Sequence, residues 1–168
     1  MLGKYDLIVY LDNDVIVKPT APPLTWFLPA RDDWDFAAFN SCELDYMPRR
    51  VERELPQYCK VTGAPMPDGW TAQRYPNSGV MVFNNTDRMR AWKPAETAVG
   101  WADQNALIHA VMSGALNWRH IPRAWNFGHM HIAGNLEAAM DDSVHFAHFT
   151  GTTYRGGRKR IMATWAEN

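Results

Sequence analysis

Several features that define special classes of protein are missing from this sequence, and paired cysteine is the first of them. Cys42 and Cys59 lie far apart and form no Cys-x-x-Cys pair. Neither a disulfide framework nor a cysteine-rich zinc site is therefore indicated, and two reduced thiols in a cytosolic protein are the simplest interpretation. Long apolar runs are missing as well, since no stretch approaches the ~18 residues that a transmembrane helix needs.

An excess of one charge is also missing. The 17 Lys and Arg residues and 18 Asp and Glu residues give the 168-residue chain a formal net charge of -1. Nothing global therefore indicates a nucleic acid or an anionic membrane as a partner. The apolar part of the first 14 residues is short, is broken by acids and lacks a small-residue cleavage site, unlike a signal peptide. We expect a soluble, cytoplasmic protein without a transmembrane segment.

The composition is that of an ordinary globular protein. Hydrophobic residues make up 46% of the chain and charged residues 21%, which suits one domain with a core. The eight Trp, seven Phe and six Tyr residues are many for this length. Aromatic side chains build cores, but they also build sugar-stacking surfaces. We interpret residues 1–168 as a single domain.

Short apolar runs predict strands, and they alternate with one clear helical pattern. The helix is expected over residues 102–114, with Asp103 as its N-cap and Gly114 at its C-terminal stop. Leu107, Ala110 and Val111 share one face of that helix. This alternation favours an α/β or mixed α+β fold. Strands are expected at Leu7–Leu11, Trp34–Asn40, Val80–Phe83 and Ser143–Gly151, with a shorter one inside 116–128.

The segment from Ser41 to Tyr75 shows no clear periodicity. It contains four prolines and two glycines, which favour turns and interrupt helices and strands. We expect a long irregular segment, and in a compact domain such a segment is either functional or mobile.

Two carboxylates, Asp12 and Asp14, directly follow the apolar strand predicted at Leu7–Leu11. Residues i and i+2 of a strand point to the same side, so both side chains would project into the crevice at the strand's carboxyl end. Two carboxylates on one side repel unless a cation lies between them, and Mg²⁺ or Mn²⁺ takes oxygen ligands. The alternative is a polar strand end at which Asp14 caps or turns the chain.

The stretch YDLIVYLDNDVIV, residues 5–17, resembles the aspartate-x-aspartate strand of GT-A-fold glycosyltransferases. The likeness is greatest to family 8, the group of glycogenin and the bacterial lipopolysaccharide galactosyl- and glucosyltransferases. Three later stretches resemble motifs of that family in the same order, and IPRAWNF, residues 121–127, resembles a further segment. These three are NSGVMVFN (77–84), ADQNAL (102–107) and HFTG (148–151). The resemblance predicts a GT-A-like mixed sheet flanked by helices.

The resemblance implies a metal site and a donor. Asp12, Asp14 and His148 would hold Mn²⁺ or Mg²⁺, which would bridge the two phosphates of a nucleotide-sugar, most often a UDP-hexose. Glycosyl transfer from such a donor releases a diphosphate, and a divalent cation offsets the charge that develops on it.

The resemblance also implies a sugar site and retention of anomeric configuration. Asp103 and Gln104 would lie near the anomeric carbon, and Asn77 and Ser78 would border the donor sugar and the acceptor. Other interpretations of these residues stay open: Asp103 as a simple helix cap, Asn77 and Ser78 as part of a turn, and His148 as a core histidine. A further alternative is a zinc site built from His129, His131, His145 and His148, although their spacing fits no familiar zinc pattern.

The sequence departs from the family in its late loop. A lysine-proline-tryptophan normally follows the HFTG-like motif and contacts the diphosphate, but the sequence here is HFTGTTYRGGRKR. Arg155, Arg158 or Lys159 would have to supply the positive charge, and glycines such as Gly151 would let the backbone approach phosphate. The alternative is a solvated basic tail.

A second departure concerns the nucleotide-binding half, which family members carry before the aspartate strand. This sequence has four residues before Tyr5. We expect an N-terminally truncated sheet, equivalent to the C-terminal portion of a GT-A fold, with an exposed edge and apolar face. Self-association, or a partner chain that supplies the missing strands, is therefore expected.

The sequence thus predicts a metal-dependent retaining glycosyltransferase. It would move a hexose from a nucleotide-sugar to a hydroxyl of a glycan, lipid or protein. The alternatives are a non-catalytic sugar- or nucleotide-binding module, and an inactive fragment that needs a partner chain.

Overall fold

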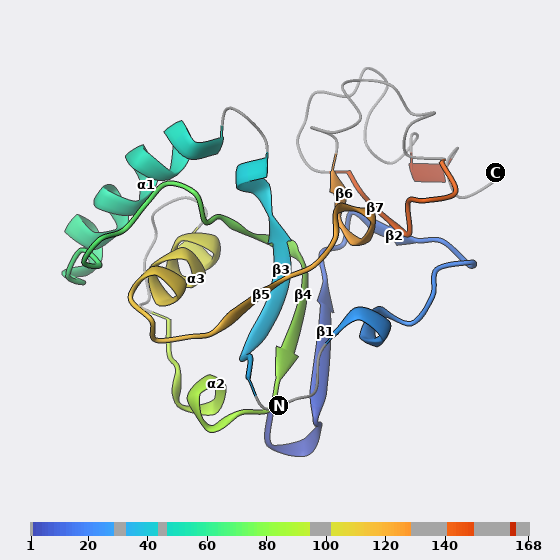
Figure 1. Ribbon diagram of the computed structural model, residues 1–168, viewed down its shortest axis with the longest axis horizontal. Coiled ribbons are helices and arrows are strands. Elements are labelled where there is room, and N and C mark those ends of the chain that lie inside the picture. Colours follow the sequence, from blue (N-terminus) through green and yellow to red (C-terminus); the bar gives the residue numbers. More distant parts are fainter. Residues whose placement is uncertain are drawn as a thin grey trace. The chain divides into compact units, whose positions relative to one another are not determined.

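The computed structural model describes residues 2–28, 33–43, 47–94, 102–128, 141–149 and 162–163. The chain forms two compact units (Figure 1). The first unit comprises Met1–Tyr10 and Pro29–Ile121, and the second comprises Leu11–Leu28 and Pro122–Asn168. The interpretation of residues 1–168 as one domain stays a prediction.

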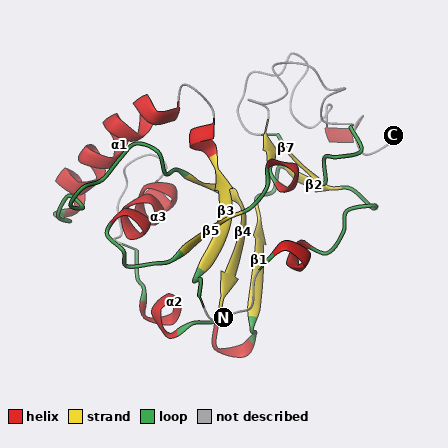
Figure 2. Ribbon diagram, in the orientation of Figure 1, coloured by secondary structure: helices red, strands yellow, loops and turns green. Residues whose placement is uncertain are grey.

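The first unit is built on a four-stranded sheet with the order β1-β4-β3-β5. Strand β3 pairs antiparallel with β4 and parallel with β5, so the sheet is mixed as expected. Helices flank it, and Figure 2 shows the strands in yellow and the helices in red. The strands are β1 (Leu7–Leu11), β3 (Phe36–Asn40), β4 (Pro76–Asn84) and β5 (Trp118–His120).

Strand β4 is longer than the strand predicted from the apolar residues at its centre. The strand was expected at Val80–Phe83, but it runs from Pro76 to Asn84 and so includes Asn77 and Ser78. A turn at these two residues is therefore excluded. The register pairs Phe36 with Phe83 and shifts between Ala38 and Asn40, where the strand is irregular.

Helix α3 (Ala102–Met112) supplies much of the core of this unit. It contacts β4 and α1, and its side chains join a buried cluster of Phe36, Ala38, Met81, Met89, Leu107, Ala110, Val111 and Leu116. The predicted stop is confirmed, because Gly114 has a φ of +73°, a conformation that glycine adopts without strain. The predicted N-cap is wrong, since the helix begins at Ala102 and Asp103 lies in its first turn.

The expectation of an irregular segment from Ser41 to Tyr75 is wrong for its central part. Helix α1 (Met47–Thr62) fills 16 of these residues and contains Pro56. Proline removes a backbone donor from a helix interior, which is why the prolines suggested a loop. The helix nevertheless buries Val51, Leu55, Tyr58 and Cys59, whose spacing of four, three and one places them on one face. Burial of this face outweighs the cost of the proline.

A buried carboxylate, Asp35, joins three parts of the first unit. It is 0% exposed, and it accepts hydrogen bonds from the Asn117 backbone N–H at 2.7 Å and from the Thr86 hydroxyl. The Arg88 guanidinium lies 3.1 Å from its second oxygen. Thr86 is also the N-cap of the short helix α2 (Asp87–Ala91). Asp35 therefore fixes the start of β3 to α2 and to the chain entering β5, and its burial is offset by these partners.

The second unit contains a smaller sheet with the order β2-β7-β6. Strand β2 (Val15–Val17) pairs antiparallel with β7 (Phe146–His148), and β6 (Phe127–Gly128) pairs parallel with β7. The last strand was expected over Ser143–Gly151; its described part confirms a strand, and Gly151 lies outside the described residues. The described 3₁₀ helices are η1 (Leu2–Lys4), η2 (Leu24–Phe27), η3 (Ser41–Glu43) and η4 (Arg123–Trp125).

Strand β1 is exposed to an unusual degree for an apolar strand. It is one of the two end strands of its sheet among the described strands, and β5 is the other. Its last three residues, Val9, Tyr10 and Leu11, are 47%, 43% and 38% exposed. Five consecutive apolar residues are typical of a strand covered on both faces. The expected exposed sheet edge is thus present in the described part of the chain.

Both cysteines are free, as expected. Cys42 donates to the Ala72 carbonyl at 3.2 Å, and burial raises the pKa of its thiol to about 11. The thiol is therefore protonated near neutral pH and unsuited to nucleophilic chemistry. None of the described helices has the length and apolar character needed to cross a bilayer.

Candidate metal centre and sugar-site residues

The turn that follows β1 brings Asp12 and Asp14 together in the second unit. The Val15 N–H donates to the Asp12 carbonyl at 3.2 Å, which closes a turn over residues 12–15. The strand therefore ends at Leu11, as expected, and a turn rather than strand alternation places the two carboxylates. The Phe149 N–H donates to the Asp14 carbonyl at 2.8 Å and ties this turn to the end of β7.

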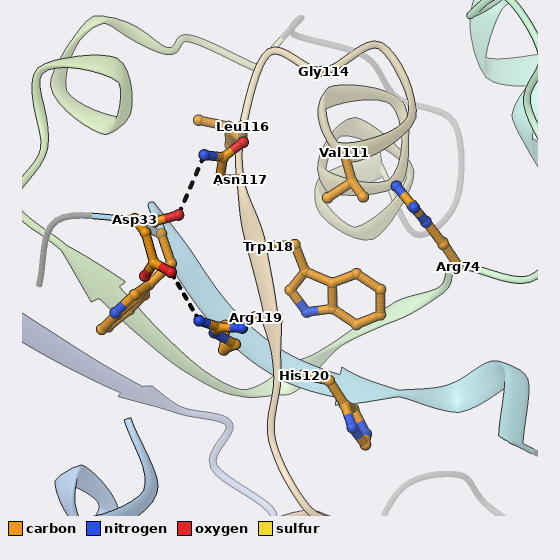
Figure 3. A pocket seen from close by; sticks show the side chains of 10 residues that line it. Asp33, Arg74, Val111, Gly114, Leu116, Asn117, Trp118, Arg119 and His120 are labelled. Atoms are coloured by element: carbon orange, nitrogen blue, oxygen red, sulfur yellow. Dashed lines mark hydrogen bonds and ion pairs between the residues drawn. The ribbon is translucent and has the colours of Figure 1, made fainter. Parts of the chain in front are cut away.

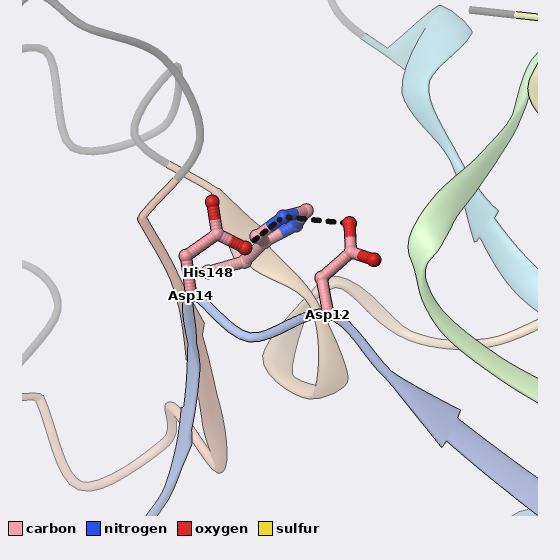
Figure 4. A group of neighbouring side chains, drawn as sticks. All are labelled: Asp12, Asp14 and His148. Carbon is pink, nitrogen blue, oxygen red and sulfur yellow. Dashed lines mark ion pairs between the residues drawn. The ribbon is translucent and has the colours of Figure 1, made fainter.

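Strand β7 contributes His148 to the same place (Figure 4). Its Nε2 lies 3.4 Å from Asp14 Oδ1 and 3.9 Å from Asp12 Oδ2. Val15 is the register partner of His148, so the pairing of β2 with β7 holds the imidazole beside the turn. One donor atom from each of the three residues lies within 4.8 Å of the other two. We call Asp12, Asp14 and His148 the carboxylate–histidine triad.

The triad is largely shielded from water but open on one side. The side chains of His148 and Asp14 are 3% and 9% exposed, whereas that of Asp12 is 36% exposed. Two unit charges of the same sign about 4 Å apart repel by about 4 kcal/mol at an effective dielectric constant of about 20. Two carboxylates in this setting are therefore stabilised by a positive charge, and the exposed side of Asp12 leaves a direction from which a ligand can approach.

The donor set fits a divalent cation. His148 Nε2 is buried and has no hydrogen-bond partner among the described residues, and a buried polar atom of this kind needs an explanation. Ligands about 2.1 Å from an octahedral ion lie about 3 Å apart when adjacent and about 4.2 Å apart when opposite. The separations of 3.4 and 3.9 Å fall in this interval. The two carboxylate oxygens suit Mn²⁺ or Mg²⁺, and the imidazole nitrogen favours the transition metal Mn²⁺ over Mg²⁺.

Asn126 is a residue of this site that the sequence interpretation did not assign. It is 2% exposed, and its Oδ1 lies 2.8 Å from His148 Nδ1. An amide oxygen can only accept, so His148 Nδ1 donates to Asn126, and Nε2 is the ring nitrogen that faces the carboxylates. The motif IPRAWNF, which contains Asn126, was noted in the sequence. No local signal, however, links Asn126 to His148, which lies 22 residues later.

The expected sugar-site residues lie in the first unit. Ser78 on β4 and Gln104 at the start of α3 are 8% and 5% exposed, and the Ser78 hydroxyl donates to Gln104 Oε1 at 3.4 Å. Asn77 Oδ1 accepts from the Gly79 N–H at 2.9 Å, and Asp103 is exposed. The structure thus brings Ser78 and Gln104 together through the packing of α3 against β4.

Two further residues of the expected donor site, Gly151 and Arg155, lie outside the described residues, so their roles stay predictions.

The alternative zinc site gains no support from its described members. The ring of His145 lies against Trp125 with 4.7 Å between centroids. His145 and His148 are three residues apart in an extended segment, so they face opposite sides. Within the described part of the chain, His145 belongs to no cluster of three metal-ligand residues, and His129 and His131 lie outside it.

The fold is similar to that of solved glycosyltransferases. The galactosyltransferase LgtC, solved with donor and acceptor sugar analogues, matches with a TM-score of 0.54 and 21% identity over 98% of this chain. The bifunctional glycosyltransferase WbbM in its apo form matches with a TM-score of 0.57 and 16% identity over 98% of this chain. The glycosyltransferase GlyE of Streptococcus pneumoniae matches with a TM-score of 0.50 and 17% identity over 97% of this chain.

These similarities establish the fold. The chain has a GT-A-like glycosyltransferase fold, as the sequence resemblance predicted, and it spans 62%, 33% and 39% of the three chains it matches. No protein-family model matches the sequence, and no curated protein matches it.

We expect Asn126→Ala to weaken Mn²⁺ binding about 10–100-fold, because loss of the partner that orients a metal-bound histidine has this effect. Asn126→Asp should retain most of the affinity, since its carboxylate accepts the same Nδ1–H. The electron paramagnetic resonance signal of free Mn²⁺, followed during titration with protein, measures the affinity. Equal losses in the two variants, or unchanged affinity in Asn126→Ala, would contradict this role.

Proposed function

We propose that the chain is the metal-binding catalytic portion of a retaining glycosyltransferase. It would transfer a hexose from a nucleotide-sugar, with UDP-hexose as the expected donor, to a hydroxyl of a glycan, lipid or protein. The observation that carries this proposal is the convergence of Asp12, Asp14 and His148 within a GT-A-like fold. LgtC was solved with donor and acceptor sugar analogues, which supports glycosyl transfer as the function, whereas the nucleotide-sugar donor and the acceptor of this chain are part of the proposal.

Each residue of the triad would have a defined task. The Asp12 and Asp14 oxygens and His148 Nε2 would hold a divalent cation, and Asn126 keeps the proton of His148 on Nδ1. A cation there would offset the negative charge of the leaving diphosphate. During transfer the bond between the anomeric carbon and the phosphate oxygen breaks, and a bond to the acceptor oxygen forms. The acceptor proton can pass to the diphosphate, so no separate base is required.

The remaining site residues would bind the sugar and the diphosphate. Gln104 and Ser78, which share a hydrogen bond, and their neighbours Asp103 and Asn77 would contact the transferred hexose. The buried amide of Gln104 is held by Ser78, so it is positioned before any ligand arrives. One of the matched LgtC structures carries a glutamine-to-glutamate substitution in its active site, which gives a precedent for a functional glutamine in this fold. Gly151 and Arg155 are proposed to contact the diphosphate.

The proposal predicts that UDP binds to the purified chain in a Mn²⁺-dependent manner. Asp12→Ala should abolish this binding, because it removes one ligand of the cation, and should leave the thermal unfolding midpoint nearly unchanged, because Asp12 is partly exposed. Calorimetric titration of UDP with MnCl₂ and with EDTA measures the difference. Asp142→Asn, at an exposed carboxylate of the same unit, is the matched control.

The outcome separates the candidate functions. Mn²⁺-dependent binding followed by turnover with a UDP-sugar supports the enzyme. Mn²⁺-dependent binding without turnover supports the alternative of a non-catalytic binding module. Unchanged UDP binding in Asp12→Ala would exclude the triad as the donor's metal site.

Gln104→Glu should lower kcat for donor hydrolysis or transfer by about 10²-fold, the usual effect of removing a group that stabilises a charged transition state. Mn²⁺-dependent UDP binding should stay within about twofold, because Gln104 is proposed to contact the sugar and not the diphosphate. Ser78→Ala should lower kcat in the same direction, with Ser113→Ala, at an exposed serine, as its control. Full kcat in Gln104→Glu, or a loss of UDP binding, would contradict the assignment.

The exposed apolar strand β1 leads to a prediction about assembly. Because a free apolar strand edge pairs readily with another chain, the chain should self-associate in sedimentation velocity at micromolar concentration. Val9→Lys should return it to a monomer, since a lysine on an edge strand opposes pairing, whereas Val61→Lys on the exposed face of α1 should not. A wild-type chain that sediments as a stable monomer would contradict this expectation.

A further inference from the structure

A cavity in the first unit follows strand β5 and has no part in the proposed function. Its volume is about 470 Å³, within the range of about 300–1,000 Å³ that is usual for ligand sites. Every residue from Leu116 to His120 lines it, and so does none of the residues assigned above to the metal or the donor sugar. An extended run of this kind is about 16 Å long. The cavity therefore extends along the strand rather than over one side chain.

Strand β5 is an end strand, so one of its sides has no partner among the described strands. On its other side it pairs parallel with β3. The Asn117 carbonyl accepts a hydrogen bond from β3 at 3.3 Å, and the Ile121 N–H donates one to β3 at 3.0 Å. The backbone groups of successive residues in a strand alternate between its two sides. The N–H and C=O groups of Trp118 and His120 therefore point away from β3, toward the open side.

Side chains on both faces of β5 line the cavity (Figure 3). Alternation along the strand places Trp118 and His120 on one face, where their rings meet nearly edge-on, and Arg119 on the other. Arg119 Nη2 lies 2.9 Å from Asp33 Oδ2. A ligand that contacts both faces at once has to lie across the edge of the strand. An added strand does so, because its own side chains alternate between the two faces of the sheet.

The two faces differ in chemistry. The indole of Trp118 packs against the core cluster that includes Val111 and Leu116, so its face is largely apolar. The other face carries Arg119, whose guanidinium has five N–H donors and keeps some of them available beside Asp33. Among the described lining residues two arginines stand against one aspartate, which gives the cavity a positive charge. An acidic ligand complements this charge.

We propose that the open edge of β5 binds an extended, acidic segment of a partner protein, which joins the sheet as an added strand. Its backbone bonds to the outward N–H and C=O groups of Trp118 and His120. Its apolar side chains lie on the Trp118 face and its acidic side chains on the Arg119 face. In this mode of recognition main-chain bonds provide affinity and alternate side chains provide specificity. The site uses no metal and no residue of the sugar site, so it is independent of the glycosyl transfer proposed above.

The test uses fluorescently labelled heptapeptides and the full chain, with fluorescence anisotropy as the measurement and EDTA present to remove any cation. One peptide alternates valine and glutamate, and its control alternates valine and lysine. We expect the glutamate peptide to bind saturably, with a Kd at least about tenfold lower than that of the lysine peptide, because like charges repel at the edge. Equal Kd values for the two peptides would overturn the proposal.

Backbone N-methylation tests the main-chain bonds directly. Two further glutamate peptides carry N-methyl groups either on every valine or on every glutamate. Because only alternate N–H groups of an added strand face the sheet, one of these peptides should lose at least about tenfold in affinity and the other should retain it. Equal effects of the two methylations, or no effect of either, would show that the peptide does not join the sheet.

His120→Pro removes a backbone N–H that points to the open side, and an edge strand accepts proline at such a position. This variant should raise the Kd of the glutamate peptide at least about tenfold relative to His120→Ala, which lacks the same side chain but keeps the N–H. Thermal unfolding midpoints of the two variants check that the sheet is intact. With similar midpoints, equal Kd values in the two variants would contradict the proposed backbone pairing.

Arg119→Ala should raise the Kd of the glutamate peptide about tenfold, since a hydrogen bond between charged groups has about this effect. Arg53→Ala, at another exposed arginine, is the matched control. An unchanged Kd in Arg119→Ala would contradict the choice of an acidic partner.

A second copy of the chain is the competing occupant of this edge, and sedimentation velocity distinguishes it. Self-association that survives His120→Pro leaves the edge of β5 available to the partner segment and supports the proposal. A chain that becomes monomeric in His120→Pro but not in Val9→Lys would fill the edge with its own copy, and the proposal would be overturned.

Discussion

The mutual repulsion of two carboxylates held beside one imidazole is the constraint on which the site depends. Asp12 and Asp14 are fixed by a turn whose carbonyls accept bonds from Val15 and from the end of β7. His148 cannot swing away, because Asn126 holds its Nδ1–H. The fold thus keeps three ligand atoms together although two of the residues repel each other. A cation bound between the two carboxylates would offset this repulsion.

The small sheet of the second unit serves this constraint. Pairing of β2 with β7 sets the register that places His148 opposite Val15. Asn126 directly precedes β6, and the pairing of β6 with β7 brings it close to His148. A slip of one residue in β7 would turn His148 to the other face of the sheet and move it away from the turn. The role of β2, β6 and β7 is therefore to set the register of the triad.

The proximity of Asp12, Asp14 and His148 could be predicted from the sequence, because the signals that mark these three residues are local. An acid pair after an apolar run marks a strand end, and the late HFTG motif identified His148 by resemblance. Asn126 could not be assigned a role, since its contact with His148 depends on the pairing of two distant strands. Helix α1 was missed for another reason: Pro56 and its neighbours favour loops, and only burial of the face formed by Val51, Leu55, Tyr58 and Cys59 makes the helix stable. Tertiary packing overrode local propensity there.

The location of a bound cation tests most directly whether Asp12, Asp14 and His148 form a metal site. A crystal of the chain soaked in MnCl₂ and measured at the manganese absorption edge gives an anomalous difference map. We expect one strong peak about 2.1–2.3 Å from an oxygen of Asp12, an oxygen of Asp14 and Nε2 of His148. A map with no peak at these three side chains, while the side chains keep their positions, would show that they do not bind the cation.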